Sequence, residues 1–316
     1  MAFPKFPFKK KKEKDFLLIE IGLEVVNMAK LSVGSEPKIE EVGRKKFTNL
    51  DGMFNASLEA IDELAGKADN FPRKAILGVS GGPIKTETIV AQYTRKEPKD
   101  PISEDEISKV LAEVSAKEES GNLKLFFSTI ASAKIDGTKV SNPIGIKGEK
   151  TALSCFIAYK QPEELKVFDK LVEEVDMDLV KIIPTSFALA KITLKKGIEE
   201  ALLFRLSKNR AEVTLLTKGH IDSIVQFDLG VSTPELFLVG LETVLEKMPS
   251  DAKPEEVWLY PDNSDVDLTE VSEKLKEFPW SNFGLERTPI ISTSESSGDI
   301  ASEDVGLSAL GLEVNE

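Results

Sequence analysis

A strand hairpin that occurs twice restricts the fold of this chain more than any other feature of its sequence. The first copy runs from Phe16 to Leu31 and the second from Ala201 to Leu216. Each copy has an apolar strand, a short polar corner and a second strand. A third strand, a helix and one further strand follow each copy in the same order. This repeated order predicts an internal duplication and therefore two related lobes.

The segments that follow the hairpins indicate the α/β class, with mixed sheets and crossover connections. In the first half we expect strands at residues 16–21, 25–33, 39–47 and 75–80, with a helix through 55–65. The second half repeats this plan, with strands at 201–206, 211–217, 220–227 and 257–260 and a helix at 234–247. Residues 302–312 form a small-residue helix with an acidic first turn, which suits close packing against a strand or a ligand.

An inserted module interrupts the first half of the chain. Residues 85–160 have the order strand, helix, strand, strand, and prolines punctuate both of its edges. Ser103 and Glu106 form a capping box at the start of its helix, near residues 103–117. We therefore expect a first lobe at residues 15–84 and 161–200, the inserted module at 85–160, and a reduced second lobe at 201–316.

The polar corners of the two hairpins indicate whether a cleft between the lobes can bind a nucleotide. In proteins that hold a phosphate chain between two lobes, such corners supply backbone N–H groups at a glycine turn, and a strand-end aspartate orients metal and water. The first corner has Gly22 with Glu20 as its acid, whereas the second has Arg205 in place of the acid and Ser207 in place of the glycine. An arginine repels Mg²⁺ and cannot orient a hydrolytic water. We expect a vestigial nucleotide cleft at these four positions, with no catalytic residue, no metal site and no resident cofactor.

Composition excludes several classes of function. The net charge of −13 argues against a nucleic-acid partner, and the single cysteine and single histidine exclude a disulfide framework and a Cys/His zinc cluster. No apolar run approaches the ~18 residues of a membrane-spanning helix. Residues 1–14 carry six lysines and three phenylalanines. They are either a disordered leader or a membrane foot, in which anionic headgroups attract Lys9, Lys10, Lys11 and Lys12.

Cys155, Trp258 and Tyr260 can each be interpreted as core residues, and the two aromatic residues have a second interpretation. Cys155 alternates with Leu153 and Ile157 on a predicted strand, so we expect a buried thiol. Trp258 and Tyr260 share one face of their strand and either pack in the core or capture a peptide.

Taken as an ordered set, these segments resemble the actin-like ATPases, and within them the PilM type of pilus assembly protein and the FtsA type of cell division protein. The resemblance rests on the lysine-rich leader followed by Ile19–Asn27, on the inserted module, and on the flanking segments 75–82 and 183–190. It implies a ribonuclease H-like, two-lobed fold. The family's second phosphate motif, D-x-G-x-x-x-T, is lost at Arg205–Ala211, and a third glycine-pair motif is replaced by Leu259–Asp265.

The PilM resemblance implies a cytoplasmic adaptor that is peripheral to the inner membrane. Such a protein would capture the cytoplasmic segment of a bitopic PilN-like membrane protein, in the groove between the first lobe and the inserted module. It would also relay contact to an assembly ATPase. The alternatives are an FtsA-like tether of a division filament, and an ATP-binding protein or kinase with an altered metal site.

Overall fold

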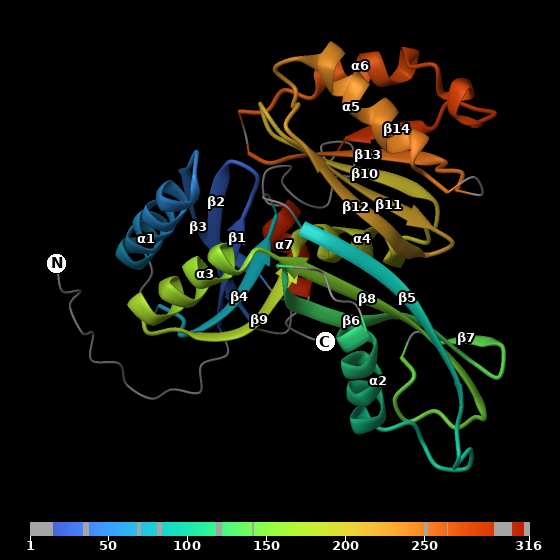
Figure 1. The fold of residues 1–316 in the computed structure, drawn as a ribbon. Coiled ribbons are helices and arrows are strands. Elements are labelled where there is room, and N and C mark those ends of the chain that lie inside the picture. Colours follow the sequence, from blue (N-terminus) through green and yellow to red (C-terminus); the bar gives the residue numbers. More distant parts are fainter. Residues whose placement is uncertain are drawn as a thin grey trace.

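The computed structural model describes residues 15–33, 38–67, 71–80, 84–117, 122–140, 142–249, 252–263, 265–293 and 305–312. These residues form two lobes and an inserted module (Figure 1). The predicted leader at residues 1–14, with Lys9, Lys10, Lys11 and Lys12, lies outside the described residues. Within the described ranges no helix is long and apolar enough to cross a membrane.

The first lobe is built on a five-stranded sheet with the order β3-β2-β1-β4-β9. Its strands are β1 (Phe16–Ile21), β2 (Val25–Ser32), β3 (Lys38–Lys46), β4 (Lys74–Val79) and β9 (Asp178–Pro184). The helices of this lobe are α1 (Leu50–Lys67), α3 (Pro162–Glu174) and α4 (Thr185–Lys195). β1 is buried along almost its whole length, which fits a sequence that is apolar at every position except Glu20.

The inserted module is an antiparallel sheet with the order β5-β8-β6-β7 and one helix. Its elements are β5 (Ile84–Thr94), α2 (Glu104–Lys117), β6 (Lys124–Ile135), β7 (Thr138–Val140) and β8 (Lys150–Lys160). The Ser103 hydroxyl caps α2 by accepting the Glu106 N–H at 3.2 Å, as half of a capping box would. The Glu106 carboxylate, however, bonds to Arg95 instead of returning to the helix start.

The second lobe repeats the sheet order of the first, as β12-β11-β10-β13-β14. It contains β10 (Ala201–Leu206), β11 (Ala211–Thr217), β12 (His220–Phe227), α5 (Pro234–Glu246), β13 (Glu256–Pro261), α6 (Thr269–Glu277), a 3₁₀ turn η1 (Trp280–Phe283) and β14 (Ile290–Thr293). In both sheets the first strand lies between an antiparallel second strand and a parallel fourth strand. The common order confirms the predicted duplication, although α6, β14 and the short β7 were not expected.

The closing helix α7 (Val305–Leu312) corrects the expected range of 201–316 for the second lobe. It packs on β1, β2 and β4 and beside α4, so it belongs spatially to the first lobe. Small residues permit this approach, since a side chain on Gly78 would run into Leu310 and one on Gly306 into Glu20. The predicted close packing of a small-residue helix against strands is confirmed.

Candidate functional site

The two hairpin corners have the same backbone geometry. In the first, the Gly22 N–H donates to the Val25 carbonyl at 2.7 Å. In the second, the Ser207 N–H donates to the Arg210 carbonyl at 2.9 Å. Position 22 therefore corresponds to position 207, and Glu20, two residues earlier on β1, corresponds to Arg205 on β10.

A second pair of equivalent positions lies where the parallel neighbours of β1 and β10 end. The Ser80 N–H, after β4, donates to the Ile21 carbonyl at 2.7 Å. The Asp262 N–H, after β13, donates to the Leu206 carbonyl at the same distance. The duplication thus places Glu20 and Ser80 of one lobe opposite Arg205 and Asp262 of the other.

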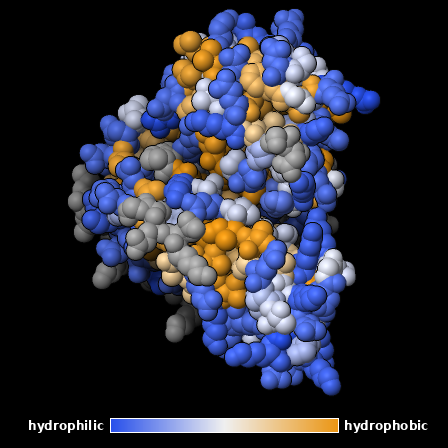
Figure 2. Space-filling model, turned by 45° about the vertical axis from the view of Figure 1, so that its right-hand side comes forward, coloured by the Kyte–Doolittle hydropathy of each residue, from blue (hydrophilic) through white to orange (hydrophobic). Residues whose placement is uncertain are grey.

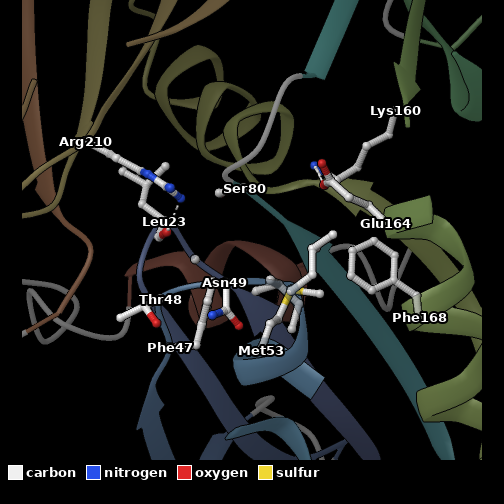
Figure 3. Close-up of a pocket in the computed structure, with 13 residues that line it drawn as sticks. Leu23, Phe47, Thr48, Asn49, Met53, Ser80, Lys160, Glu164, Phe168 and Arg210 are labelled. Carbon is white, nitrogen blue, oxygen red and sulfur yellow. Dashed lines mark hydrogen bonds and ion pairs between the residues drawn. The ribbon is translucent and has the colours of Figure 1, made fainter. Parts of the chain in front are cut away.

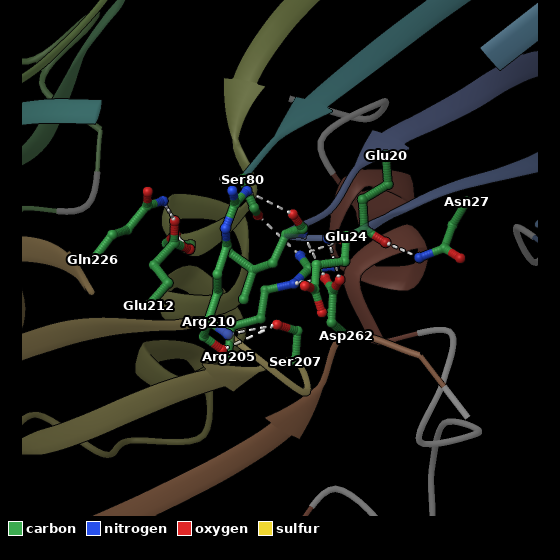
Figure 4. A network of polar contacts seen from close by, with 12 residues as sticks. Glu20, Glu24, Asn27, Ser80, Arg205, Ser207, Arg210, Glu212, Gln226 and Asp262 are labelled. Atoms are coloured by element: carbon green, nitrogen blue, oxygen red, sulfur yellow. Dashed lines mark hydrogen bonds and ion pairs between the residues drawn. The ribbon is translucent and has the colours of Figure 1, made fainter. Parts of the chain in front are cut away.

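Arg205 contacts the other three side chains across the lobe boundary (Figure 4). Its Nε donates to Asp262 Oδ1 at 3.0 Å and its Nη1 donates to Ser80 Oγ at 3.1 Å, while the guanidinium also forms an ion pair with Glu20. The guanidinium is 4% exposed and both carboxylates are fully buried. Burial alone would lower the pKa of Arg205, but the charges of Glu20 and Asp262 outweigh it and raise that pKa.

Asp262 also binds the backbone of the opposite lobe. Its Oδ1 accepts the Leu23 N–H at 3.0 Å and its Oδ2 accepts the Glu24 N–H at 2.9 Å. These are the amides of the first corner, the groups that were expected to face a phosphate. The carboxylate of this protein therefore occupies the corner's own donors.

The glycine at the first corner makes room for that carboxylate. A Cβ atom at Gly22 would lie 2.4 Å from Asp262 Oδ1, far inside van der Waals contact. The backbone φ of Gly22 is not positive, so space and not conformation requires the glycine. On the other side of the network, Asn27 Nδ2 donates to Glu20 Oε2 at 2.9 Å and fixes that carboxylate from β2.

The structure brings together three of the four predicted positions. Glu20 and Arg205 are in direct contact, and Gly22 packs against Asp262 beside them. Ser207 does not take part, because its hydroxyl accepts the Arg210 N–H at 2.9 Å within its own corner. Asp262 was expected only as part of a degenerate third motif. Its position directly after β13, equivalent to Ser80 after β4, is the signal that could have identified it.

A second buried polar group lies next to this network, on β11 and α4. The Glu212 carboxylate accepts hydrogen bonds from Ser186 Oγ and Gln226 Nε2. Burial raises the pKa of Glu212, against the opposing effect of these donors and of Arg205. Since Ser186 lies in the first turn of α4 of the first lobe, this carboxylate is another contact between the lobes.

A cavity of about 170 Å³ opens beside the first corner (Figure 3). The first lobe supplies most of its lining, including Leu50 and Phe168, while Lys160 comes from the end of β8 and Arg210 from the second lobe. Lys160 forms a buried ion pair with Glu164 of α3, and burial lowers the pKa of its ammonium group. The volume is below the roughly 300–1,000 Å³ of sites for drug-sized ligands, so it fits a side chain better than a nucleotide.

The inserted module carries further apolar side chains that its own core does not fully bury. Ile89 of β5, Leu111 of α2 and Ile130 of β6 are only partly buried over the module's core, and Leu125 is exposed. Figure 2, which turns the module toward the viewer, shows a hydrophobic area near the middle of the molecule. Apolar patches rimmed by polar residues are characteristic of binding surfaces.

The remaining candidates are structural. Cys155 is fully buried, and burial raises the pKa of its thiol to about 11. Trp258 and Tyr260 stack with ring centroids 6.3 Å apart and pack against the larger core cluster, so the core interpretation is confirmed. Among the described residues, no group of His, Cys, Asp and Glu is arranged to hold a metal ion.

Comparisons with known proteins give structural but no sequence matches. No protein-family model and no curated protein matches the chain. Among solved structures, a chain of the PilM–PilN type IV pilus biogenesis complex matches with a TM-score of 0.62 and 14% identity, covering 95% of this chain and 98% of that one. A Bacteroides thetaiotaomicron protein with an actin-like ATPase fold and unknown function matches with a TM-score of 0.53 and 10% identity, covering 95% and 96%. The predicted fold class is therefore confirmed: the chain has the two-lobed actin-like ATPase fold, which it shares with the PilM type of pilus assembly protein.

Proposed function

We propose that this protein is a PilM-like adaptor at the cytoplasmic face of the inner membrane, and that it does not hydrolyse ATP. Its partner would be the cytoplasmic segment of a PilN-like protein with one membrane span, and an assembly ATPase would be a second contact. The shared fold supports the first part of the proposal. The observation that carries the second part is the buried guanidinium of Arg205 between Glu20 and Asp262.

The contacts of this network oppose nucleotide chemistry in two ways. Hydrolysis in such clefts needs a divalent ion held by carboxylates, and here Arg205 neutralises those carboxylates and would repel the ion. Phosphate binding needs free N–H groups at the corner, and here Leu23 and Glu24 donate to Asp262. The contacts that oppose metal binding and those that oppose phosphate binding both involve Asp262.

Calorimetric titration of the full chain with ATP and Mg²⁺ tests this part of the proposal. We expect no saturable binding at micromolar protein concentration and no phosphate release above the buffer rate. Metal-dependent binding in the micromolar range, or measurable turnover, would overturn it and favour the ATP-binding alternative.

The groove between the first lobe and the inserted module suits an extended peptide. The cavity beside the first corner, where the first lobe meets Lys160 of the module and Arg210 of the second lobe, combines apolar walls with the buried Lys160–Glu164 pair. This composition is typical of sites that anchor one side chain and fix its orientation. The hydrophobic area on the module would hold the neighbouring residues. A membrane contact of Lys9, Lys10, Lys11 and Lys12 is part of the proposal but lies outside the described residues.

Peptide binding can be measured with labelled cytoplasmic segments of the single-span proteins encoded beside this gene. We expect one of them to bind, and Leu50→Lys to weaken binding by about tenfold because a charge would enter the apolar wall. Ile290→Lys is the matched control, since Ile290 is exposed on β14 of the other lobe. Equal effects of the two substitutions, or no binding of any such segment, would contradict this groove.

A further inference from the structure

The cleft contains a carboxylate in the position of a ligand. Asp262 is fully buried, and each of its two oxygens accepts one N–H of the first corner. Its Oδ1 also accepts Nε of Arg205 at 3.0 Å. An anion that accepts two successive backbone N–H groups and a guanidinium is bound as a phosphate group is bound at glycine-containing corners.

The chain provides this carboxylate from the opposite lobe. Asp262 follows β13 of the second lobe, and the two amides that it accepts lie between β1 and β2 of the first. In two-lobed clefts a ligand that contacts both lobes favours the closed arrangement, because it binds that arrangement better than the open one. Asp262 likewise connects the two lobes, but it is covalently part of the second lobe.

We propose that Asp262 and Arg205 are an internal substitute for an anionic ligand and its counter-cation, and that they hold the lobes closed when no nucleotide is bound. The underlying site is an anion site that consists of the Leu23 and Glu24 amides and the Arg205 guanidinium. Its natural occupant in this protein is the Asp262 carboxylate. This proposal concerns the cleft alone and does not depend on the pilus role.

The contacts of Arg205 support the assignment of the two roles. Its one guanidinium is shared by the carboxyl groups of Glu20 and Asp262 within the buried network. Removing the Asp262 carboxylate leaves Glu20 and Arg205 paired and two amides without an acceptor. Buried donors without an acceptor are costly, so an external anion that enters there restores the lost contacts.

The test is to remove the carboxylate and to supply inorganic phosphate. We expect phosphate to raise the melting temperature of Asp262→Ala by several degrees and to bind it saturably, at least about tenfold more tightly than it binds the unmodified protein. Chloride at the same ionic strength is the control for screening. The double variant Asp262→Ala/Arg205→Met should lose the phosphate effect, because it lacks the guanidinium. A folded Asp262→Ala protein that does not respond to phosphate would overturn the proposal.

A second measurement does not depend on the variant folding. Hydrogen exchange of the unmodified protein should show the Leu23 and Glu24 amides strongly protected without any added ligand, and unchanged when ATP or phosphate is added. The Lys208 and Asn209 amides, which occupy the equivalent positions of the second corner, provide the comparison. Exchange of Leu23 and Glu24 at the rate of an open loop would show that the carboxylate does not hold the corner.

Discussion

Glycine 306 is the residue at which one added methyl group should have the largest local effect. A Cβ at this position of α7 would lie 1.7 Å from Glu20 Oε1, and Glu20 cannot move away because Arg205 and Asn27 hold it. We expect Gly306→Ala to lower the free energy of unfolding by about 1–3 kcal/mol in urea titrations.

Gly311 of the same helix is the matched control. Its nearest neighbour would be a methyl carbon of Leu31 at 3.5 Å, an ordinary contact, so Gly311→Ala should be neutral or should stabilise α7 by up to about 1 kcal/mol. Equal destabilisation by both substitutions would show that helix packing in general, and not the Glu20 carboxylate, requires the small residue.

Cys155, the single cysteine of the chain, is a natural reporter for the inserted module. Its thiol is fully buried and its pKa is raised to about 11, so little thiolate exists at pH 8. We expect the native protein to resist a thiol reagent such as DTNB and to react fully in denaturant. Rapid labelling under native conditions would mean that the module opens on its own.

At the residue scale, the sequence predicted which residues lie in the cleft better than it predicted the contacts that they make. Glu20, Gly22 and Arg205 were identified because they stand at equivalent places in a repeated motif. Asp262 was not identified in that way, because its segment was compared with a glycine pair of the family and not with Ser80 at the equivalent place of the first lobe. Its importance comes from a contact with Leu23, which is 239 residues away in the chain.

Among the elements, the connection between β5 and α2 contains a residue of the predicted capping box, Glu106, that binds Arg95 instead of the helix start. Glu106 accepts Nε and Nη2 of Arg95 at 2.8 and 2.9 Å and the Tyr93 hydroxyl at 2.9 Å. The hydrogen bond from Arg95 is the main cause of a lowered Glu106 pKa, with the ordinary value at 4.5. A carboxyl group with a lowered folded-state pKa stabilises the fold above the unfolded-state value and loses this effect as the pH falls through the folded-state value.

We therefore expect Glu106→Gln to reduce stability at pH 7 by about 1 kcal/mol, and the difference from the unmodified protein to shrink as the pH falls below 4.5. Thermal unfolding of both proteins at pH values from 7 to 3 measures this difference in stability. Glu104→Gln, in the same first turn of α2, controls for the loss of a negative charge at the helix start. A difference that stays constant with pH would contradict the ionic role of Glu106.

Strands that end at polar corners were predicted to the residue, whereas helix α1 extends beyond its predicted range of 55–65 at both ends and the shortest strands were missed. β10, β11 and β12 have the predicted bounds because their apolar runs end at polar corners. β7 has three residues and β14 has four, which is too short for any periodicity to appear. α7 was recognised as a helix that packs closely, but its return to the first lobe depends on the path of the chain and has no local signal.

For the whole molecule, the contacts between the lobes differ greatly in depth. Lys46 and Asp265 form an ion pair between the lobes with both side chains largely exposed, whereas the Arg205 network is buried. Exposed pairs contribute under about 1 kcal/mol, while removing one member of a buried pair costs about 3–5 kcal/mol.

We expect Lys46→Ala to leave the unfolding free energy within about 1 kcal/mol, and Arg205→Met to lower it by about 3–5 kcal/mol. High salt should weaken only the first contact, since buried charges are screened much less. Denaturant titrations at two salt concentrations distinguish the pairs. If both substitutions were mild, the lobes would be held by their apolar contacts and not by the buried charges.

The two-lobed architecture was predictable because the same order of strands and helix occurs twice in the sequence. A repeated hairpin and a punctuated insertion were sufficient for two lobes and a module, and the likeness to the PilM–PilN complex and to an actin-like ATPase fold agrees with that plan. The closed contact between the lobes was not predictable, since both partners of each bond are distant in the chain.

The duplication places Glu20 and Arg205 at the same position in two copies of one hairpin, yet they have opposite charges and bind each other. A gene that descended from a repeat would have needed both changes, and neither is harmless alone, since each leaves a buried charge without its counterpart. The two codons should therefore evolve as a pair. In an alignment of homologues, positions 20 and 205 should covary, with an acidic residue at position 205 only where position 20 has also changed.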